Sequence, residues 1–239
     1  MYPRAAIKQR AKSSFFANYW PLVGLFLIVS VLAGSSSGSA FSGFSNGLRL
    51  RSTDLDSALE IRKWIETYKP VILSVGVAAS VIAAAYSVFV GNIIMVGAAK
   101  LGLNAYRGER VHILDIFTFF RSGKKYKNAL LTMLIKDLFI LIGLMLFIVP
   151  GIIVAFGLAQ VEYLLADGVD RSPMEIIRMS WEIMRGRKGD YFVFTLSFIG
   201  WILLTGLTLG ILGIFFTNPY ISIAEAGYYD NIITFAPAE

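Results

Sequence analysis

Long apolar blocks constrain this chain more than any other feature of its sequence. They cover residues 19–34, 70–99, 129–149, 151–166 and 191–228. Each block approaches or exceeds the roughly 20 residues that a helix needs to cross a bilayer. Only 16% of the residues are charged, whereas a soluble domain carries about 25%. The sequence therefore predicts an all-α integral membrane protein that forms one polytopic membrane domain over residues 1–239.

Lysine and arginine residues beside these blocks predict the orientation of the chain, because cytoplasmic loops carry an excess of both. Residues 1–18 hold four of them, 100–128 hold seven and 168–190 hold five. Residues 35–69 also hold five, but four acidic residues accompany them. We therefore expect the first three segments to be cytoplasmic and 35–69 to be an extracytoplasmic loop that contains a short helix.

Two long apolar regions, 129–167 and 191–228, must each leave the cytoplasm and return to it. Pro150-Gly151 is the expected turn of the first hairpin, since proline lacks the N–H for a helical hydrogen bond and glycine tolerates turn dihedrals. The second hairpin is expected to turn near 210–213. The sequence thus predicts about six transmembrane helices in three hairpins, with both termini cytoplasmic. These helices are expected at residues 19–34, 70–99, 129–149, 151–167, 191–209 and 211–228.

Amphipathic segments are expected to lie along the membrane surface as interfacial helices. The basic segment 1–18 forms a lead-in to the first apolar block. SPMEIIRMSWEIMRGRKG opens with Ser172, Pro173 and Glu175, a capping box with proline in the first turn. Apolar residues then recur on one face of this helix. Its predicted interfacial residues are Trp181, Arg178 and Arg185.

Polar side chains inside the apolar blocks are the main functional signal. Lys136 and Asp137 are neighbours, so on a helix they point about 100° apart and each needs a partner elsewhere. At a rise of 1.5 Å per residue, Lys136 lies roughly 10 Å from the expected cytoplasmic end of its helix. Four helices contribute polar groups at a similar depth. This predicted inner-leaflet layer comprises Lys136, Asp137, Glu162, Gln160, Asn92 and Glu225.

Two interpretations of this layer remain open. Ionisable groups inside a membrane are costly and usually face a protein interior or a wet cavity. In the first interpretation, pairs such as Lys136 with Glu162 hold the helix bundle together. In the second, the layer lines an inward-facing pocket for a lipid headgroup, an ion, a peptide or a small solute.

A family resemblance rests on motifs in the C-terminal half. WEIMRGRKGDYF at 181–192 is followed by LSFIGW at 196–201, TLGI at 208–211, and then Pro219-Tyr220 and Tyr228-Tyr229. This pattern resembles the bacterial integral-membrane family catalogued as domain of unknown function nine-seven-five. The resemblance implies a multi-helix protein of the bacterial plasma membrane and implies no activity. The pattern is also distantly similar to membrane domains beside glycerophosphodiester phosphodiesterases, which hints at lipid handling.

Several kinds of chemistry lack their residues in this sequence. There is no cysteine and a single histidine, His112, so neither a zinc site nor a thiol nucleophile is expected. Neither HExxH nor a phosphate-binding glycine loop is present, and serines with GxSxG spacing occur only in the Gly/Ser-rich segment 34–47, which is expected to be an extracytoplasmic linker rather than a nucleophile site. The net charge of +6 arises beside the apolar blocks, where orientation explains it, so we do not expect a nucleic-acid partner. We therefore predict a protein without catalytic residues, metal or cofactor.

The predicted function is that of a non-catalytic, multi-pass protein of the bacterial plasma membrane. It would bind a lipid, small solute or peptide through the inner-leaflet layer, as a transport or lipid-handling module. One alternative is a partner-binding accessory or immunity-type membrane protein. A further alternative is an enzyme that acts on lipid-derived substrates. The expected partners are membrane lipids and a peptide or protein.

Overall fold

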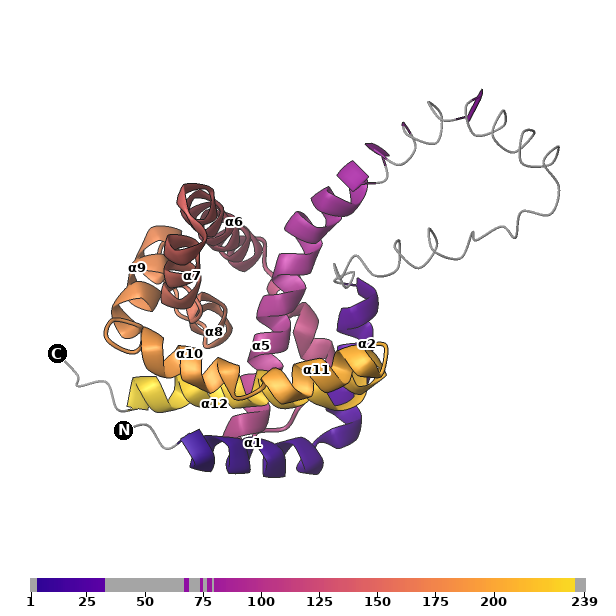
Figure 1. Cartoon of the computed structure of the whole chain (residues 1–239), viewed down its shortest axis with the longest axis vertical. Coiled ribbons are helices and arrows are strands. Elements are labelled where there is room, and N and C mark those ends of the chain that lie inside the picture. Colours follow the sequence, from indigo (N-terminus) through magenta and orange to yellow (C-terminus); the bar gives the residue numbers. More distant parts are fainter. Residues whose placement is uncertain (1–3, 33–66, 69–73, 75–76, 79, 235–239) are drawn as a thin grey trace.

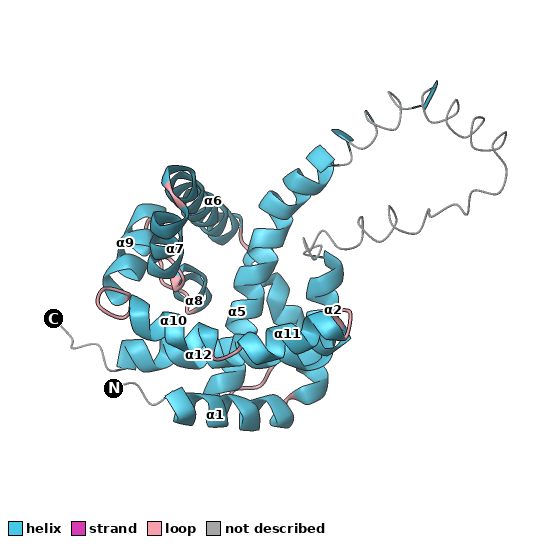
Figure 2. Ribbon diagram, viewed as in Figure 1, coloured by secondary structure: helices cyan, strands magenta, loops and turns pink. Residues whose placement is uncertain are grey.

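A computed structural model describes residues 4–32, 67–68, 74, 77–78 and 80–234. The elements in this part of the chain are helices (Figure 2), as the sequence predicts. The N-terminal half contains α1 (Arg4–Ala17), α2 (Tyr19–Leu32), the π-helix η1 (Ser87–Gly91), α5 (Asn92–Arg107) and the 3₁₀-helix η2 (Ile113–Arg121). The C-terminal half contains α6 (Gly123–Leu146), α7 (Ile148–Gly157), α8 (Val161–Ala166), α9 (Pro173–Ile183), α10 (Lys188–Leu196), α11 (Ile199–Leu207), the π-helix η3 (Gly213–Thr217) and α12 (Asn218–Thr234).

Four described helical segments are long and apolar enough to cross a membrane: Ser80–Arg107, Gly123–Leu146, Ile148–Ala166 and Lys188–Leu207. The prediction of a membrane protein is supported at this level, but six spans are not confirmed. The described part of the first expected span, α2, has 14 residues. The last expected span continues to Thr234 and carries polar residues such as Asn218, Glu225 and Asp230, which lower its hydropathy. The predicted loop 35–69 lies almost wholly outside the described residues.

Two expected helix ends were wrong. The helix predicted to end at residue 99 continues to Arg107 and ends at Gly108, whose φ of 82° is the left-handed conformation that glycine adopts readily. The next helix begins at Gly123 rather than at residue 129. Both errors have the same cause. The predicted bounds followed the apolar blocks, whereas each helix continues into the less apolar residues beside its block. Much of 100–128 is therefore helical.

The hairpin of α6 and α7 turns at Phe147, not at Pro150-Gly151 as predicted. Phe147 has extended backbone dihedrals and separates the two helices. Pro150 instead lies in the first turn of α7, where a helix has no use for the missing N–H. Gly151 lies where the helices approach closely, since a Cβ atom there would be 2.8 Å from the Leu144 Cα. Near the second predicted turn, α11 ends at Leu207, and Leu209 and Gly210 have positive φ values.

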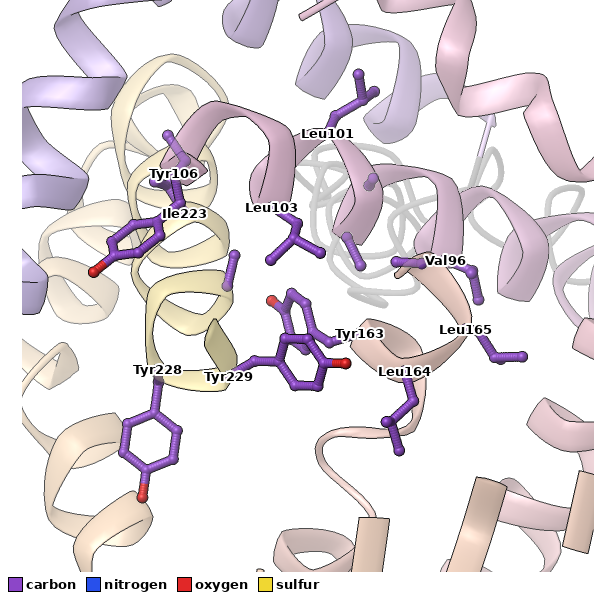
Figure 3. Close-up of a cluster of buried hydrophobic side chains, with 14 of the residues drawn as sticks. Val96, Leu101, Leu103, Tyr106, Tyr163, Leu164, Leu165, Ile223, Tyr228 and Tyr229 are labelled. Carbon is purple, nitrogen blue, oxygen red and sulfur yellow. The ribbon is translucent and has the colours of Figure 1, made fainter. Parts of the chain in front are cut away.

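Helix α5 runs through the middle of the protein, and α8 and α12 both pack against it. Figure 3 shows the buried cluster at this junction, where Tyr163 of α8 and Tyr229 of α12 lie together. Their rings stack with centroids 5.7 Å apart. Two glycines of α5 and α12 allow close approach, because a Cβ atom at Gly102 would be 2.9 Å from the Ser222 hydroxyl and one at Gly227 would collide with the Tyr106 ring.

The N-terminal segment forms α1, which runs antiparallel to α12 along its length (Figure 1). Ile7, Ala11 and Phe15 recur every four residues, so they share one helix face, and all three are buried. This apolar face therefore packs against the protein, on α12 and α5. The basic residues Lys8 and Arg10 lie over the rings of Phe198 and Tyr106 at 4.4 and 4.7 Å.

Candidate functional site

Lys136 of α6 forms an ion pair with Glu162 of α8. The Lys136 Nζ donates to the Glu162 Oε1 at 2.5 Å, and the two side chains are 12% and 26% exposed. Lys136 lies 13 residues after the first residue of α6, about 20 Å along the helix at 1.5 Å per residue. The expected 10 Å was too small because α6 begins earlier than predicted.

Asp137, the next residue, reaches a different helix. Its Oδ2 accepts a hydrogen bond of 2.9 Å from the Asn92 amide at the start of α5. Successive helical residues point about 100° apart, so Lys136 and Asp137 connect α6 to α8 and to α5 respectively. Asp137 forms no ion pair within the part of the chain that the structure describes. An acidic group inside a candidate span thus has only a neutral partner.

The π-helix η1 immediately precedes Asn92. A π-turn shifts the hydrogen-bond pattern of a helix and is frequent at functional sites. Here the Phe89 carbonyl of η1 accepts a hydrogen bond of 3.0 Å from the Tyr126 hydroxyl of α6. Tyr126 and Asp137 therefore both connect α6 to the region of the π-turn, eleven residues apart along the same helix.

Glu225 of α12 lies close enough to Glu162 and Lys136 to interact with both charges. It also accepts a hydrogen bond of 3.4 Å from the Tyr163 hydroxyl of α8. We call Lys136, Asp137, Asn92, Glu162 and Glu225 the polar cluster. The polar cluster holds three carboxyl groups and one ammonium group, on four helices. No group of three His, Asp or Glu residues close enough to hold a metal ion occurs in the described ranges.

Gln160, the sixth residue of the predicted layer, faces elsewhere. It is 1% exposed, its backbone N–H donates to the Ser180 hydroxyl, and its side-chain amide donates to the Met184 sulfur at 3.5 Å. Its Oε1 atom has no hydrogen-bond partner among the described residues. Gln160 therefore belongs to the packing between α8 and α9. Helical spacing carried a signal of this, because residues two positions apart point about 200° apart, so Gln160 and Glu162 face opposite sides of a helix.

A second charged group joins three helix ends and was not predicted. Arg107, at the end of α5, donates from Nη1 to Asp167 at 2.6 Å and from Nε to Asp230 at 2.8 Å. The Tyr229 hydroxyl also donates to Asp167, at 3.2 Å. The sequence carried one signal of it, because each return helix has a glutamate followed five residues later by an aspartate. The shared arginine is distant in sequence, so spacing could not identify it.

The predicted interfacial residues lie on or just after α9, which packs against α6, α7 and α8. Its predicted capping box is present. The side chains of Ser172 and Glu175 each accept a hydrogen bond from the backbone N–H of the other residue. The Trp181 ring lies against Gly157, where a Cβ atom would be 2.3 Å from the indole, and the Lys188 Nζ lies 3.3 Å from the ring centroid. Trp181 is therefore a packing residue as well as a partly exposed one.

Arg178 and Arg185 differ in their surroundings. Both side chains are exposed, but Arg178 lines an apolar groove between α6, α7 and α9, whereas Arg185 lies after α9. Neither arginine forms an ion pair with another residue that the structure describes. Arg178 is thus an unpaired cation beside apolar side chains of two candidate spans.

A comparison with protein families matches residues 140–235 of the chain. No curated protein and no solved structure matches the chain. The matched family is described as "Protein of unknown function (DUF975)". Its match includes Glu162, Arg178 and Glu225, and it excludes Lys136 and Asp137. Over residues 140–235 the chain carries the pattern of the DUF975 family, as the motifs in its C-terminal half predicted.

Proposed function

We propose that this protein is a non-catalytic, multi-pass membrane protein that binds an ammonium-bearing ligand at the polar cluster. The charge balance of that cluster is the observation that carries the proposal. Glu162 takes up the single ammonium of Lys136, so Asp137 has only the neutral amide of Asn92. A ligand ammonium group would supply the missing positive charge. Intramembrane ionisable groups commonly mark such binding or transport sites.

The two chemical pairs of the cluster have different roles in this proposal. The Lys136–Glu162 pair is mostly buried and holds α6 against α8. The hydrogen bond between Asp137 and Asn92 is exposed, so a ligand can reach it. The adjacent π-turn supports the same assignment, because π-turns are frequent at functional sites. The protein would then act as a transport or lipid-handling module.

The proposed location is the bacterial plasma membrane, with both termini in the cytoplasm. The support is a set of contacts among the basic segments predicted to be cytoplasmic. Arg4 pairs with Asp190, and Lys124 pairs with Asp170 at 3.2 Å. Arg107 additionally connects the end of α5 to Asp230 near the C-terminal end of α12. Each of these ion pairs joins segments that the sequence predicts on the same side of the membrane, which supports the proposed orientation.

The test compares Asp137→Asn with Asp170→Asn, a control that removes an exposed acidic group outside the candidate spans. The wild-type protein in nanodiscs should unfold at a higher temperature when phosphatidylethanolamine replaces phosphatidylcholine, because the quaternary ammonium of choline has no N–H to donate to Asp137. Free ethanolamine in the buffer separates a soluble ammonium ligand from a lipid headgroup. Asp137→Asn should abolish the shift, and Asp170→Asn should keep it. An unchanged shift in Asp137→Asn, or no shift with either probe in the wild type, would contradict the proposal.

A further inference from the structure

We infer that the groove between α6, α7 and α9 is a lipid-binding site that takes one acyl chain of an anionic phospholipid. Its volume is about 310 Å³, at the lower end of the range of about 300–1,000 Å³ typical of ligand pockets. The apolar lining residues are Phe139, Val154, Leu158, Met174, Ile177 and Trp181. Arg178 is the one charged residue among the described residues that line it.

The position of the groove identifies hydrocarbon as the occupant. Phe139 belongs to the candidate span Gly123–Leu146, and Val154 and Leu158 belong to the candidate span Ile148–Ala166. A groove between two membrane-spanning helices opens to lipid rather than to water. The lining exposes only apolar surface, to which Arg178 contributes the aliphatic part of its side chain, so an acyl chain finds only apolar contacts there.

Packing beneath α9 keeps one wall of the groove in place. The Trp181 ring lies directly on Gly157, a position where no side chain would fit. The Ser180 hydroxyl, on the next residue, donates to the Gly157 carbonyl at 3.0 Å. A wall fixed by these contacts is ready for a ligand without rearrangement, which lowers the entropic cost of binding.

The charges around the groove favour an anionic headgroup. The Arg178 guanidinium has no ion-pair partner among the residues with described positions. The Glu175 carboxylate, one turn earlier, already accepts a hydrogen bond from the Ser172 N–H. Lys188 contributes a second cation, above the Trp181 ring. A guanidinium binds phosphate oxygens with two parallel hydrogen bonds, so Arg178 can hold a phosphate whose acyl chain lies in the groove.

The experiment measures which lipids remain bound to the purified full-length protein. The protein is reconstituted in nanodiscs of phosphatidylcholine and phosphatidylglycerol in equal parts, and bound lipids are counted by native mass spectrometry. The wild type should retain phosphatidylglycerol in preference to phosphatidylcholine. Arg178→Gln should lower that preference about tenfold, the loss expected for one charge-assisted contact. Arg185→Gln removes an exposed arginine outside the groove and should keep the preference.

Two further variants separate the headgroup contact from the acyl-chain site. Arg178→Lys keeps the charge and should retain part of the preference. Val154→Trp fills the groove and should reduce retention of both lipids, while a wild-type circular dichroism spectrum shows that it folds. Equal losses in Arg178→Gln and Arg185→Gln would overturn the inference, as would full retention in Val154→Trp. Asp137→Asn should leave the preference unchanged, so this test is independent of the polar cluster.

Discussion

The Lys136 ammonium and the Glu162 carboxylate lie 2.5 Å apart between α6 and α8. This ion pair explains how α6 carries a lysine in the middle of an apolar span. The adjacent Asp137 points to α5 instead, so two neighbouring residues attach one helix to two others. The pairing of Lys136 with Glu162, expected from their sequence positions, is present, whereas ligand binding by the polar cluster stays a prediction.

Breaking this pair should destabilise the protein. Lys136→Met or Glu162→Gln leaves one charge without its partner in a poorly hydrated place. We expect each single change to lower the free energy of unfolding by about 2–3 kcal/mol, less than the 3–5 kcal/mol of a fully buried pair because both groups are partly exposed. Thermal unfolding in detergent measures the loss.

The double variant Lys136→Met/Glu162→Gln provides the control for this pair. It removes both charges, so it should recover much of the stability that either single change loses. Additive losses would show that the two side chains do not interact in the membrane. Recovery would leave the binding role of Asp137 as a separate question, since that residue contacts α5.

Arg107 should stabilise the junction of α5, α8 and α12. It donates from two different nitrogens, to Asp167 and to Asp230. Arg107→Gln would leave both carboxylates without a cation and should cost about 2 kcal/mol of unfolding free energy. Arg107→Lys should be intermediate, because one ammonium lacks the planar fork that serves two acceptors. Wild-type stability in Arg107→Lys, measured by thermal unfolding, would show that the fork geometry is unimportant.

A matched pair of glycines tests the packing beneath α9. Gly157→Ala places a methyl group where the Trp181 ring lies, so the ring must move, at a cost of about 1–3 kcal/mol. Gly200→Ala in α11 meets no atom within 4 Å and should raise the unfolding free energy by about 0.5–1 kcal/mol through helix propensity. Equal unfolding temperatures in the two variants would contradict the observed contact between Trp181 and Gly157.

Local sequence patterns predicted a good part of this fold. The apolar blocks predicted the helices, the capping box predicted the start of α9 at Ser172, and glycine predicted the turn at Gly210. Helix ends were less predictable, because α5 and α6 both extend beyond their apolar blocks into polar residues. Pro150 misled for a related reason, since proline suits the first turn of a helix as well as a loop.

Contacts between polar side chains were predictable only where the depth of a residue in one helix could be compared with the depth of a residue in another. That comparison brought Lys136 and Glu162 together, but it also placed Gln160 in the same layer, although Gln160 faces α9. Depth takes no account of direction, and residues 160 and 162 point about 200° apart on a helix. Arg107 was missed because its partners are 60 and 123 residues away.

The capping box of α9 should give a small pH dependence. The Ser172 backbone N–H, with its hydroxyl, holds the pKa of the Glu175 carboxyl below its ordinary value. Because the folded-state pKa is lowered, the stabilisation is complete above the unfolded-state pKa of about 4.3. It is lost as the pH falls through the lower, folded-state pKa. The difference in unfolding temperature between wild type and Glu175→Gln should therefore shrink below about pH 4. A difference that is independent of pH would exclude this contribution.

The orientation of the chain can be tested with single cysteines, because the natural sequence has none. Cysteine at Ser37, in the segment predicted to be extracytoplasmic, should react with a membrane-impermeant maleimide in intact cells. Cysteines at Lys125 and Glu182, both exposed in the structure, should react only after the membrane is permeabilised. Lys125 and Glu182 belong to two basic segments that the Lys124–Asp170 ion pair joins, so they must behave alike. Labelling of one but not the other in intact cells would contradict the proposed orientation.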